Sequence, residues 1–234
     1  MKKLYFAGLL ISALNALNAH AGEWIADSAT QCQVWNPNPK PDEAVKWTGE
    51  CKDGKATGSG SLEWLKEGRP NGVFKGSYVD GLRHGLGIFE YTNGNRYEGG
   101  YLNDKQTGKG ILTWATGGRY EGDFLDGKRT GKGSMAYADG KNYTGNFVNG
   151  KKHGNGILKG ILGDRYEGDF LDDKLNGKGI ATTRFGVRAE GDFQDGKPIG
   201  AIILTSPTGE RTEILIQDGK LISTKALPPI DSKP

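Results

Sequence analysis

Residues 120–142, YEGDFLDGKRTGKGSMAYADGKN, contain a pattern that recurs with drift on both sides of itself. Copies begin 23 residues apart, as at Phe74, Tyr97 and Tyr120 (97 − 74 = 23). Further copies begin at Tyr143, Tyr166, Ala189 and Thr212. Repetition at a fixed period of this length is typical of solenoid proteins, so the structure of one repeat determines the architecture.

Each repeat opens with a segment whose alternate residues predict a β-strand. Counted from the leading aromatic residue as position 1, position 3 is glycine and position 5 is again aromatic, as in Tyr120, Gly122 and Phe124. Side chains at positions 1, 3 and 5 of a strand share one face. We expect the glycine to leave a slot between the two rings, in which a ring of the neighbouring repeat lies flat. An α-helix is disfavoured because it needs apolar spacings of three and four and tolerates few glycines.

A tight turn and a second strand complete the repeat. Positions 7 and 8 are Asp-Gly or Asn-Gly, the strongest short-range signal of a β-hairpin, at Asp80-Gly81, Asp126-Gly127, Asn149-Gly150 and Asp195-Gly196. The second strand is expected to start at Gly-Lys-Gly, as in Gly131–Gly133, and to run to about position 18. The predicted fold is all-β, an elongated solenoid of stacked antiparallel β-hairpins in which each hairpin contacts mainly its neighbours.

The combination of Tyr-Glu-Gly-Asp-Phe, Asp-Gly-Lys and Gly-Lys-Gly at this 23-residue period resembles the MORN repeat (membrane occupation and recognition nexus). The resemblance covers about Trp47 to Arg211 and is specific because the copies stand in register. It implies a twisted row of β-hairpins, in agreement with the residue pattern. It also implies a scaffold or interaction module, and lipid contact has been proposed for some proteins of this kind.

Residues 1–21, MKKLYFAGLLISALNALNAHA, predict a secretory signal peptide. Two lysines precede an apolar run too short for a transmembrane helix, and Ala19-His20-Ala21 matches a small-x-small cleavage pattern. A buried N-terminal helix is the alternative. We therefore expect an exported protein of bacterial type, periplasmic or extracellular. Removal of Lys2 and Lys3 leaves 29 basic and 28 acidic residues, and a net charge of 29 − 28 = +1 argues against a nucleic-acid partner.

The two cysteines, Cys32 and Cys51, are predicted to form a disulfide because the chain is expected to be exported. In the chain-entropy model the loop that it closes contributes roughly 3 kcal/mol. Cys51 occupies position 5 of an imperfect first repeat that begins at Trp47, where later repeats have a ring. Residues 22–46 and this disulfide are thus expected to cap a hairpin that has no preceding neighbour. Redox thiols are the alternative, disfavoured because the spacing is unlike Cys-x-x-Cys.

The repeats are expected to fill residues 47–223 as about seven repeats and a terminal half-repeat. Trp47 and Phe74 are 74 − 47 = 27 residues apart, so the first repeat has a four-residue insertion, which we place around residues 66–70. The seventh repeat decays, with Ala189 in place of the ring and Ile202 in place of a glycine. Residues 224–234 are predicted to be a disordered tail because they are polar and contain prolines.

No catalytic, cofactor or metal site is predicted. His84 and His153 both stand at position 11, and six strand steps of about 4.8 Å separate them by roughly 29 Å, so they are interpreted as turn residues. Motifs of serine hydrolases, phosphate loops and zinc proteases are absent. Charged segments such as Arg119–Asp123 are interpreted as cross-strand ion pairs rather than calcium ligands. We expect a non-enzymatic protein, since no segment is long enough to be an added catalytic domain.

An aromatic row at position 18 is one candidate binding surface. It lies in the N-terminal half and consists of Trp64, Tyr91, Trp114 and Tyr137. Two strand steps, about 9.6 Å, separate successive members. The row could stack on sugar rings or hold an extended peptide; alternatively, the rings pack on neighbouring glycines.

An apolar stripe on the face opposite the rings is the other candidate. It combines position 6 with position 15, where the familiar MORN pattern is more polar. Its members are Leu102, Leu125 and Leu171, with Val79 and Val148, and Ile111, Ile157 and Ile180, with Ile88. A protein partner, a second copy of the chain, a membrane surface or the curl of the sheet could cover it.

The sequence therefore predicts a non-enzymatic exported scaffold for protein–protein interactions, with association to a membrane left open. The alternative is a carbohydrate-binding module that recognises envelope glycans through the aromatic row.

Overall fold

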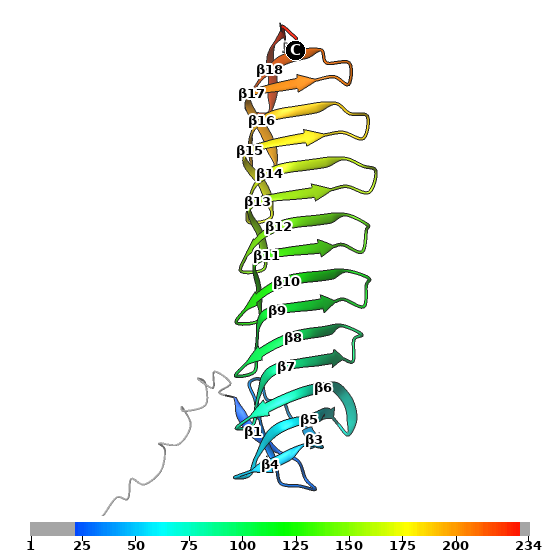
Figure 1. Ribbon diagram of the computed structural model, residues 1–234, viewed down its shortest axis with the longest axis vertical. Coiled ribbons are helices and arrows are strands. Elements are labelled where there is room, and N and C mark those ends of the chain that lie inside the picture. Colours follow the sequence, from blue (N-terminus) through cyan, green and yellow to red (C-terminus); the bar gives the residue numbers. More distant parts are fainter. Residues whose placement is uncertain (1–21, 230–234) are drawn as a thin grey trace, which may run out of the picture.

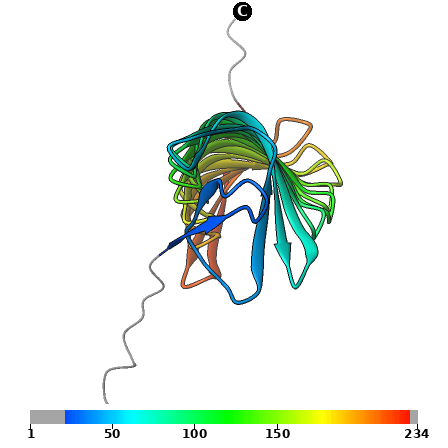
Figure 2. The ribbon, with the colours of Figure 1, turned by 90° about the horizontal axis from the view of Figure 1, so that it is seen from below.

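The computed structural model describes residues 22–229, which form an all-β rod. Strands β5 to β19 pair antiparallel in chain order along one long open sheet (Figure 1). Seen end-on, the sheet is arched (Figure 2). No helix in the described residues is long and apolar enough to cross a membrane. The predicted fold class is confirmed, whereas the predicted signal peptide at residues 1–21 lies outside the described residues.

The strands fall into three groups along the rod. The cap and first repeat contain β1 (Glu23–Ala26), β2 (Gln33–Asn36), β3 (Glu43–Trp47), β4 (Glu50–Lys52) and β5 (Lys55–Lys66). The regular repeats contain β6 (Arg69–Val79), β7 (Leu82–Tyr91), β8 (Arg96–Leu102), β9 (Lys105–Thr113), β10 (Arg119–Leu125), β11 (Lys128–Ala136), β12 (Asn142–Val148), β13 (Lys151–Lys159), β14 (Arg165–Leu171) and β15 (Lys174–Thr182). The C-terminal end contains β16 (Arg188–Gln194), β17 (Lys197–Thr205), β18 (Arg211–Gln217) and β19 (Lys220–Leu227).

Two-residue turns close the hairpins at the predicted sites. In the β10–β11 hairpin Leu125 pairs with Lys128, and the φ angles of Asp126 and Gly127 are 48° and 77°. Positive φ at both central residues defines a type I′ turn, whose twist matches that of the flanking strands. The Asp-Gly and Asn-Gly pairs of the other repeats have the same conformation.

A β-bulge interrupts each regular hairpin just beyond its position-3 glycine. Gly122 pairs with Gly133, but the next residue, Asp123, pairs with Thr130. Gly131 lies in the bulge with a φ of 54°. The second strand therefore starts at Lys128, earlier than predicted, and the first glycine of Gly-Lys-Gly serves the bulge. Because a bulge bends and twists its strand, this irregularity favours the arch.

The side chain at position 1 satisfies a carbonyl next to the bulge. The Tyr120 hydroxyl donates to the Asp123 carbonyl at 3.0 Å. The equivalent bond recurs from the hydroxyls of Tyr97, Tyr143 and Tyr166 and from the indole N–H of Trp47. This bond orients the position-1 ring along its own strand.

The slot over the glycines is filled by the ring of the same repeat. A Cβ atom added to Gly99 or to Gly110 would lie 2.6 Å from the Tyr97 hydroxyl oxygen, and so both residues must be glycine. The prediction that a neighbouring repeat supplies this ring was wrong. The hydrogen bond described above reinforces this placement but does not cause it, because Phe74, which has no hydroxyl, lies over Gly76 and Gly87 in the same way.

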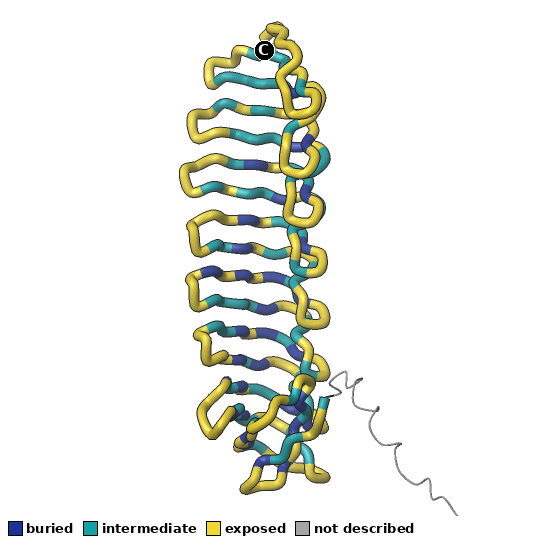
Figure 3. Tube along the Cα trace, turned by 180° about the vertical axis from the view of Figure 1, so that it is seen from behind, coloured by how far each residue is buried: buried dark blue, intermediate teal, exposed yellow. Residues whose placement is uncertain are grey.

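Rings of positions 1 and 5 form a continuous column along the rod, here called the ring column. Tyr120 meets Phe124 of its own repeat and Phe147 of the next edge-to-face, with centroids 5.2 and 5.0 Å apart. The column runs through Trp47, Tyr78, Phe74, Tyr101, Tyr97, Phe124, Tyr120, Phe147, Tyr143, Phe170, Tyr166 and Phe193. Every member is at most 6% exposed, and buried residues accordingly recur at the same place in successive strands (Figure 3). The column is both the core and the link between repeats.

The N-terminal cap covers the first hairpin. Cys32 and Cys51 lie at disulfide-bonding distance, with Cα atoms 5.7 Å apart. Val34 and Val45 of the cap are buried in the same cluster as the ring column. The buried Asp27 carboxylate accepts the Trp47 backbone N–H at 2.7 Å. In Figure 2 the cap strands lie at the open side of the arch.

Two segments form more strand than the sequence predicted. The insertion near residues 66–70 lengthens β5 and β6 to 12 and 11 residues, and β3 pairs with the end of β5, as in Val45 opposite Trp64. Residues 224–227 belong to β19 rather than to a disordered tail, and the terminal half-repeat is a full hairpin. Backbone bonding to β18 stabilises this polar segment, because ladder hydrogen bonds do not depend on side chains.

Alkaline pH should destabilise the fold. Burial raises the pKa of Tyr97, Tyr120, Tyr143 and Tyr166 from 10.0 to about 12. The folded state thus favours the neutral phenol, and this stabilisation is full below pH about 10 and is lost as pH rises through about 12. We expect the urea midpoint to fall across this window, in step with phenolate absorbance. Phenolate formation near pH 10 in the folded protein, with an unchanged midpoint, would contradict this.

Candidate binding surfaces

The inner side of the arch has cations facing the ring column. Position 10 pairs across the hairpin with the position-5 ring, as in Phe124 opposite Arg129. The Arg129 guanidinium lies 5.6 Å from the Tyr120 and Phe147 ring centroids. Arg83 and Lys152 lie over rings in the same way. Sequence reasoning missed these cations, although their position directly opposite the position-5 ring could have identified them.

Arg83 is the most enclosed of these cations. Its Nε lies 2.8 Å from Asp104 Oδ1, and the side chains are 16% and 8% exposed. The same carboxylate oxygen accepts the Arg83 backbone N–H at 2.9 Å. Asp104 is the second residue of its hairpin turn, where most repeats have glycine, and its φ angle is 68°. The pair fixes Arg83 between the rings of Phe89 and Tyr101.

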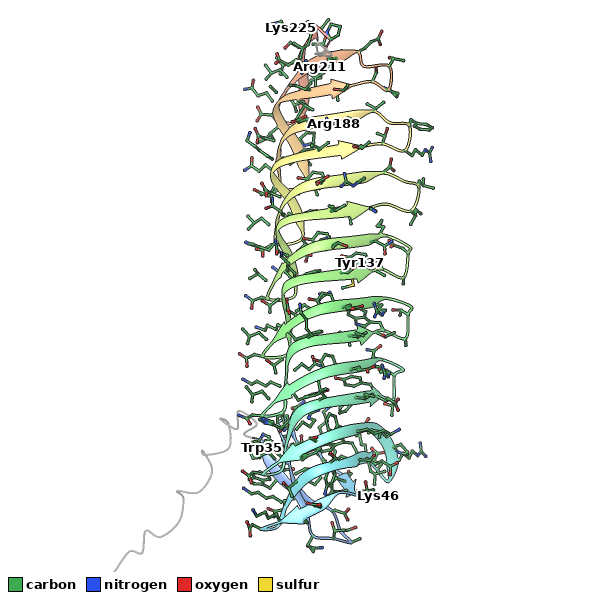
Figure 4. All side chains as sticks on the ribbon, in the orientation of Figure 1. Trp35, Lys46, Tyr137, Arg188, Arg211 and Lys225 are labelled. Carbon is green, nitrogen blue, oxygen red and sulfur yellow. A yellow bond between two sulfur atoms is a disulfide. The ribbon has the colours of Figure 1, made fainter. Side chains whose placement is uncertain are left out.

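The predicted aromatic row divides into two parts. Trp114 packs against Gly118 and faces Arg129. Tyr137 faces Lys152 and lies just after β11 (Figure 4). These two rings are partly buried against the core, which agrees with the alternative that rings of the row pack within the protein instead of binding a ligand. Trp64 is also partly buried against the core, but together with Tyr91 it lines a cavity.

This cavity, here called the cap cavity, opens between the cap and the first repeats. Its volume is about 350 Å³. Its lining residues come from the cap and from β5, β6 and β7, and are Asn36, Pro37, Asn38, Lys40, Glu43, Trp64, Asn71, Arg83, Phe89 and Tyr91. Glu43 fixes the cap side by accepting hydrogen bonds from the Asn36 side chain and the Lys40 backbone.

A shallow groove, here called the outer groove, follows the opposite face of the sheet. Hollows recur where repeat positions 2, 3, 13, 14 and 15 meet, with volumes of about 870, 300 and 250 Å³. The largest spans Glu98 to Asn155, and the two smaller ones adjoin Ile88 and Ile180. Glycine backbone, position-2 glutamates and position-13 lysines line most of it.

The structure separates the predicted apolar stripe into two rows. Position 15 is half-buried, with Ile88, Ile111 and Ile180 lining the outer groove and Ile157 at the equivalent place. Position 6 lies beside the hairpin turns, where Leu102, Leu125 and Leu171 are 50%, 59% and 47% exposed. Lysines pair with this second row, as in Leu125 opposite Lys128, so it is not a continuous apolar surface.

The other polar residues form local contacts. Arg119 pairs with Glu121 of its own strand at 2.7 Å, and Lys109 pairs across strands with Asp123 at 2.7 Å, so the ion pairs are only partly cross-strand. His84 and His153 lie within β7 and β13, beside the bulge, rather than in turns. No group of three or more potential metal ligands occurs among residues 22–229.

Comparison with known proteins identifies the repeat. The family model of the MORN repeat matches residues 74–96, 97–119, 120–141, 143–161 and 166–183. A search of curated proteins found no match. Among solved structures, the chain is similar to the SAS-4 (dCPAP) TCP domain of Drosophila melanogaster, in complex with a proline-rich motif of Ana2 (dSTIL). The identity is 16%, the alignment covers 75% of this chain and 94% of that chain, and the TM-score is 0.43.

Asp104→Asn should destabilise the protein by at least about 2 kcal/mol, because it leaves the enclosed Arg83 guanidinium without a counter-charge. Asp126→Asn is the matched control, the same change in the equivalent turn, where the pair with Lys105 is exposed. Its effect should stay within about 0.5 kcal/mol. Urea denaturation measures both, and equal effects would refute the role assigned to the Arg83–Asp104 pair.

Proposed function

This chain belongs to the MORN-repeat proteins, and from that premise we propose that it is a non-enzymatic binding scaffold. Its outer groove holds an extended segment of a protein partner. Repeats of this family typically mediate protein or membrane interactions. The supporting observation is the recurrence of the groove at the same repeat positions from Lys75 to Gly191.

The groove has the composition of a peptide site. Its largest hollow, about 870 Å³, combines the apolar side chain of Ile111 with backbone of Gly110 and Gly122. Successive repeats present the same positions, so a partner in extended conformation meets an isoleucine at position 15 of most repeats, with Ser134 in its place in the Tyr120 repeat. Successive repeats are two strand steps, about 9.6 Å, apart, which is close to the three-residue repeat of a chain in the extended polyproline II conformation.

The charges along the groove favour a protein over a nucleic acid. Glu98 and Glu121 supply negative charge, while Lys109 and Lys132 supply positive charge in the same hollow. A nucleic-acid site would present one sign of charge along its length. A partner segment with apolar residues and charges of both signs complements this surface.

The groove is preorganised. Its strands are hydrogen-bonded on both sides, as β10 is to β9 and β11, and the ring column fixes their spacing. Recognition thus depends on side chains and not on addition of a strand. A rigid surface reduces the entropy lost on binding.

Export to the periplasm or the exterior is part of the proposal. The Cys32–Cys51 pair suits an oxidising compartment, and the first 21 residues have the composition of a signal peptide.

Random peptides displayed on phage test the groove directly, because selection needs no identified partner. Peptides selected on the purified protein should combine apolar residues with both signs of charge. Ile111→Glu should weaken them at least tenfold, or about 1.4 kcal/mol, by fluorescence anisotropy, because it places a charge in the apolar hollow.

Leu125→Glu is the matched control, since Leu125 is exposed outside the groove and receives the same substitution. It should change affinity less than twofold. Lys132→Glu, a surface change within the groove, should also weaken binding. Selection of no binder, or equal sensitivity to Ile111→Glu and Leu125→Glu, would overturn the proposal.

A further inference from the structure

The cap cavity differs from the hollows of the outer groove because it places two aromatic side chains beside free amides. Trp64 is half-buried and Tyr91 is 37% exposed. One side of the Tyr91 ring packs on Phe89, with centroids 4.3 Å apart. The two rings are held by the core while remaining accessible to a ligand.

The polar groups of the cavity fall into two classes. The Asn36 amide and the Glu43 carboxylate are engaged with the cap itself, and Arg83 is neutralised by Asp104. The side chains of Asn38, Asn71 and Lys40 are exposed, and they form no hydrogen bond or ion pair with any of residues 22–229. The free groups therefore comprise two neutral amides and one ammonium.

This combination favours a sugar ring as the ligand. The apolar C–H face of a pyranose can pack on Trp64 and Tyr91. Its hydroxyls both donate and accept hydrogen bonds, as do the amides of Asn38 and Asn71. A volume of about 350 Å³ lies within the usual range for small-ligand sites.

An extended peptide fits the cavity less well. The strands β5, β6 and β7 are each paired on both sides and offer no free edge to a peptide backbone, and β2 and β3 contribute only one terminal residue each, Asn36 and Glu43. With Arg83 and Glu43 already engaged, Lys40 is the one free charged group among the described residues of the lining, so charge complementarity to a peptide is also weak.

We propose that the cap cavity binds one pyranose residue of a neutral oligosaccharide, stacked on Trp64 and Tyr91 and hydrogen-bonded to Asn38 and Asn71. The site is built before binding. The disulfide, Glu43 and the Arg83–Asp104 pair fix its walls, which lowers the entropy cost of binding. This inference does not rest on the outer groove.

Titration calorimetry of the purified, oxidised protein tests the proposal with cellotriose, chitotriose, maltotriose and mannotriose as probes. At least one probe should bind saturably. Trp64→Ala and Tyr91→Ala should each weaken that binding at least tenfold. Asn71→Ala, an exposed change that leaves the core intact, should weaken it several-fold by loss of a hydrogen bond.

Trp114→Ala is the matched control, since it removes a ring of the same row outside the cavity. It should change affinity less than twofold, and unfolding midpoints should confirm that each variant is folded. The proposal fails if no probe binds saturably, if Asn71→Ala has no effect, or if Trp114→Ala weakens binding as much as Trp64→Ala. Ile111→Glu should not affect sugar binding, which separates failure of this site from failure of the groove.

Discussion

The structure depends on an aromatic ring that lies flat over two glycines of its own hairpin. In the Tyr97 repeat, Gly99 and Gly110 sit so close to the ring, and Gly99 also to the backbone of Gly110, that neither tolerates a Cβ atom. The bulge next to this contact leaves a carbonyl that the tyrosine hydroxyl satisfies. Ring, glycines and bulge are therefore one unit, and its repetition generates the ring column.

A core of this kind extends along the rod and must be closed at both ends of the rod. At the N-terminal end Trp47 occupies the ring position, its indole lies over Gly49 and Gly60, and the cap with its disulfide covers it. At the other end the slot is filled differently: Ile202 replaces a glycine, and its side chain lies against Gly191. The cap also forms one wall of the cap cavity, so the same segment both covers the end of the core and builds that cavity.

The two proposed sites lie on opposite faces of a single sheet. The inner face is occupied by rings and cations, and it is open to a ligand mainly where the cap meets Trp64 and Tyr91. The outer face has no second layer in the described residues, so its bare glycine backbone and half-buried isoleucines form the groove. Each face can thus bind a different kind of molecule without interference.

Local features were predictable from the sequence, and features that depend on bending were not. Asp126-Gly127 specified a hairpin turn, and the alternation of Tyr120, Gly122 and Phe124 specified a buried face. The bulge at Gly131 was missed because period-two alternation assumes a straight strand. For the same reason Leu125 and Ile111 were assigned to one stripe, although they lie in separate rows. The cap cavity joins residues far apart in sequence, and no local pattern reports such contacts.

The most direct test of this account compares two glycine-to-alanine changes by urea denaturation. Gly99→Ala places a methyl group against the Tyr97 hydroxyl and the Gly110 backbone, and should lower the free energy of unfolding by about 2 kcal/mol or more. At Gly160 an added Cβ meets only ordinary contacts, the nearest at 3.5 Å, and φ is not positive. Gly160→Ala should therefore change stability by less than about 1 kcal/mol. Equal effects of the two changes would contradict the claim that the ring-over-glycine contact holds the fold together.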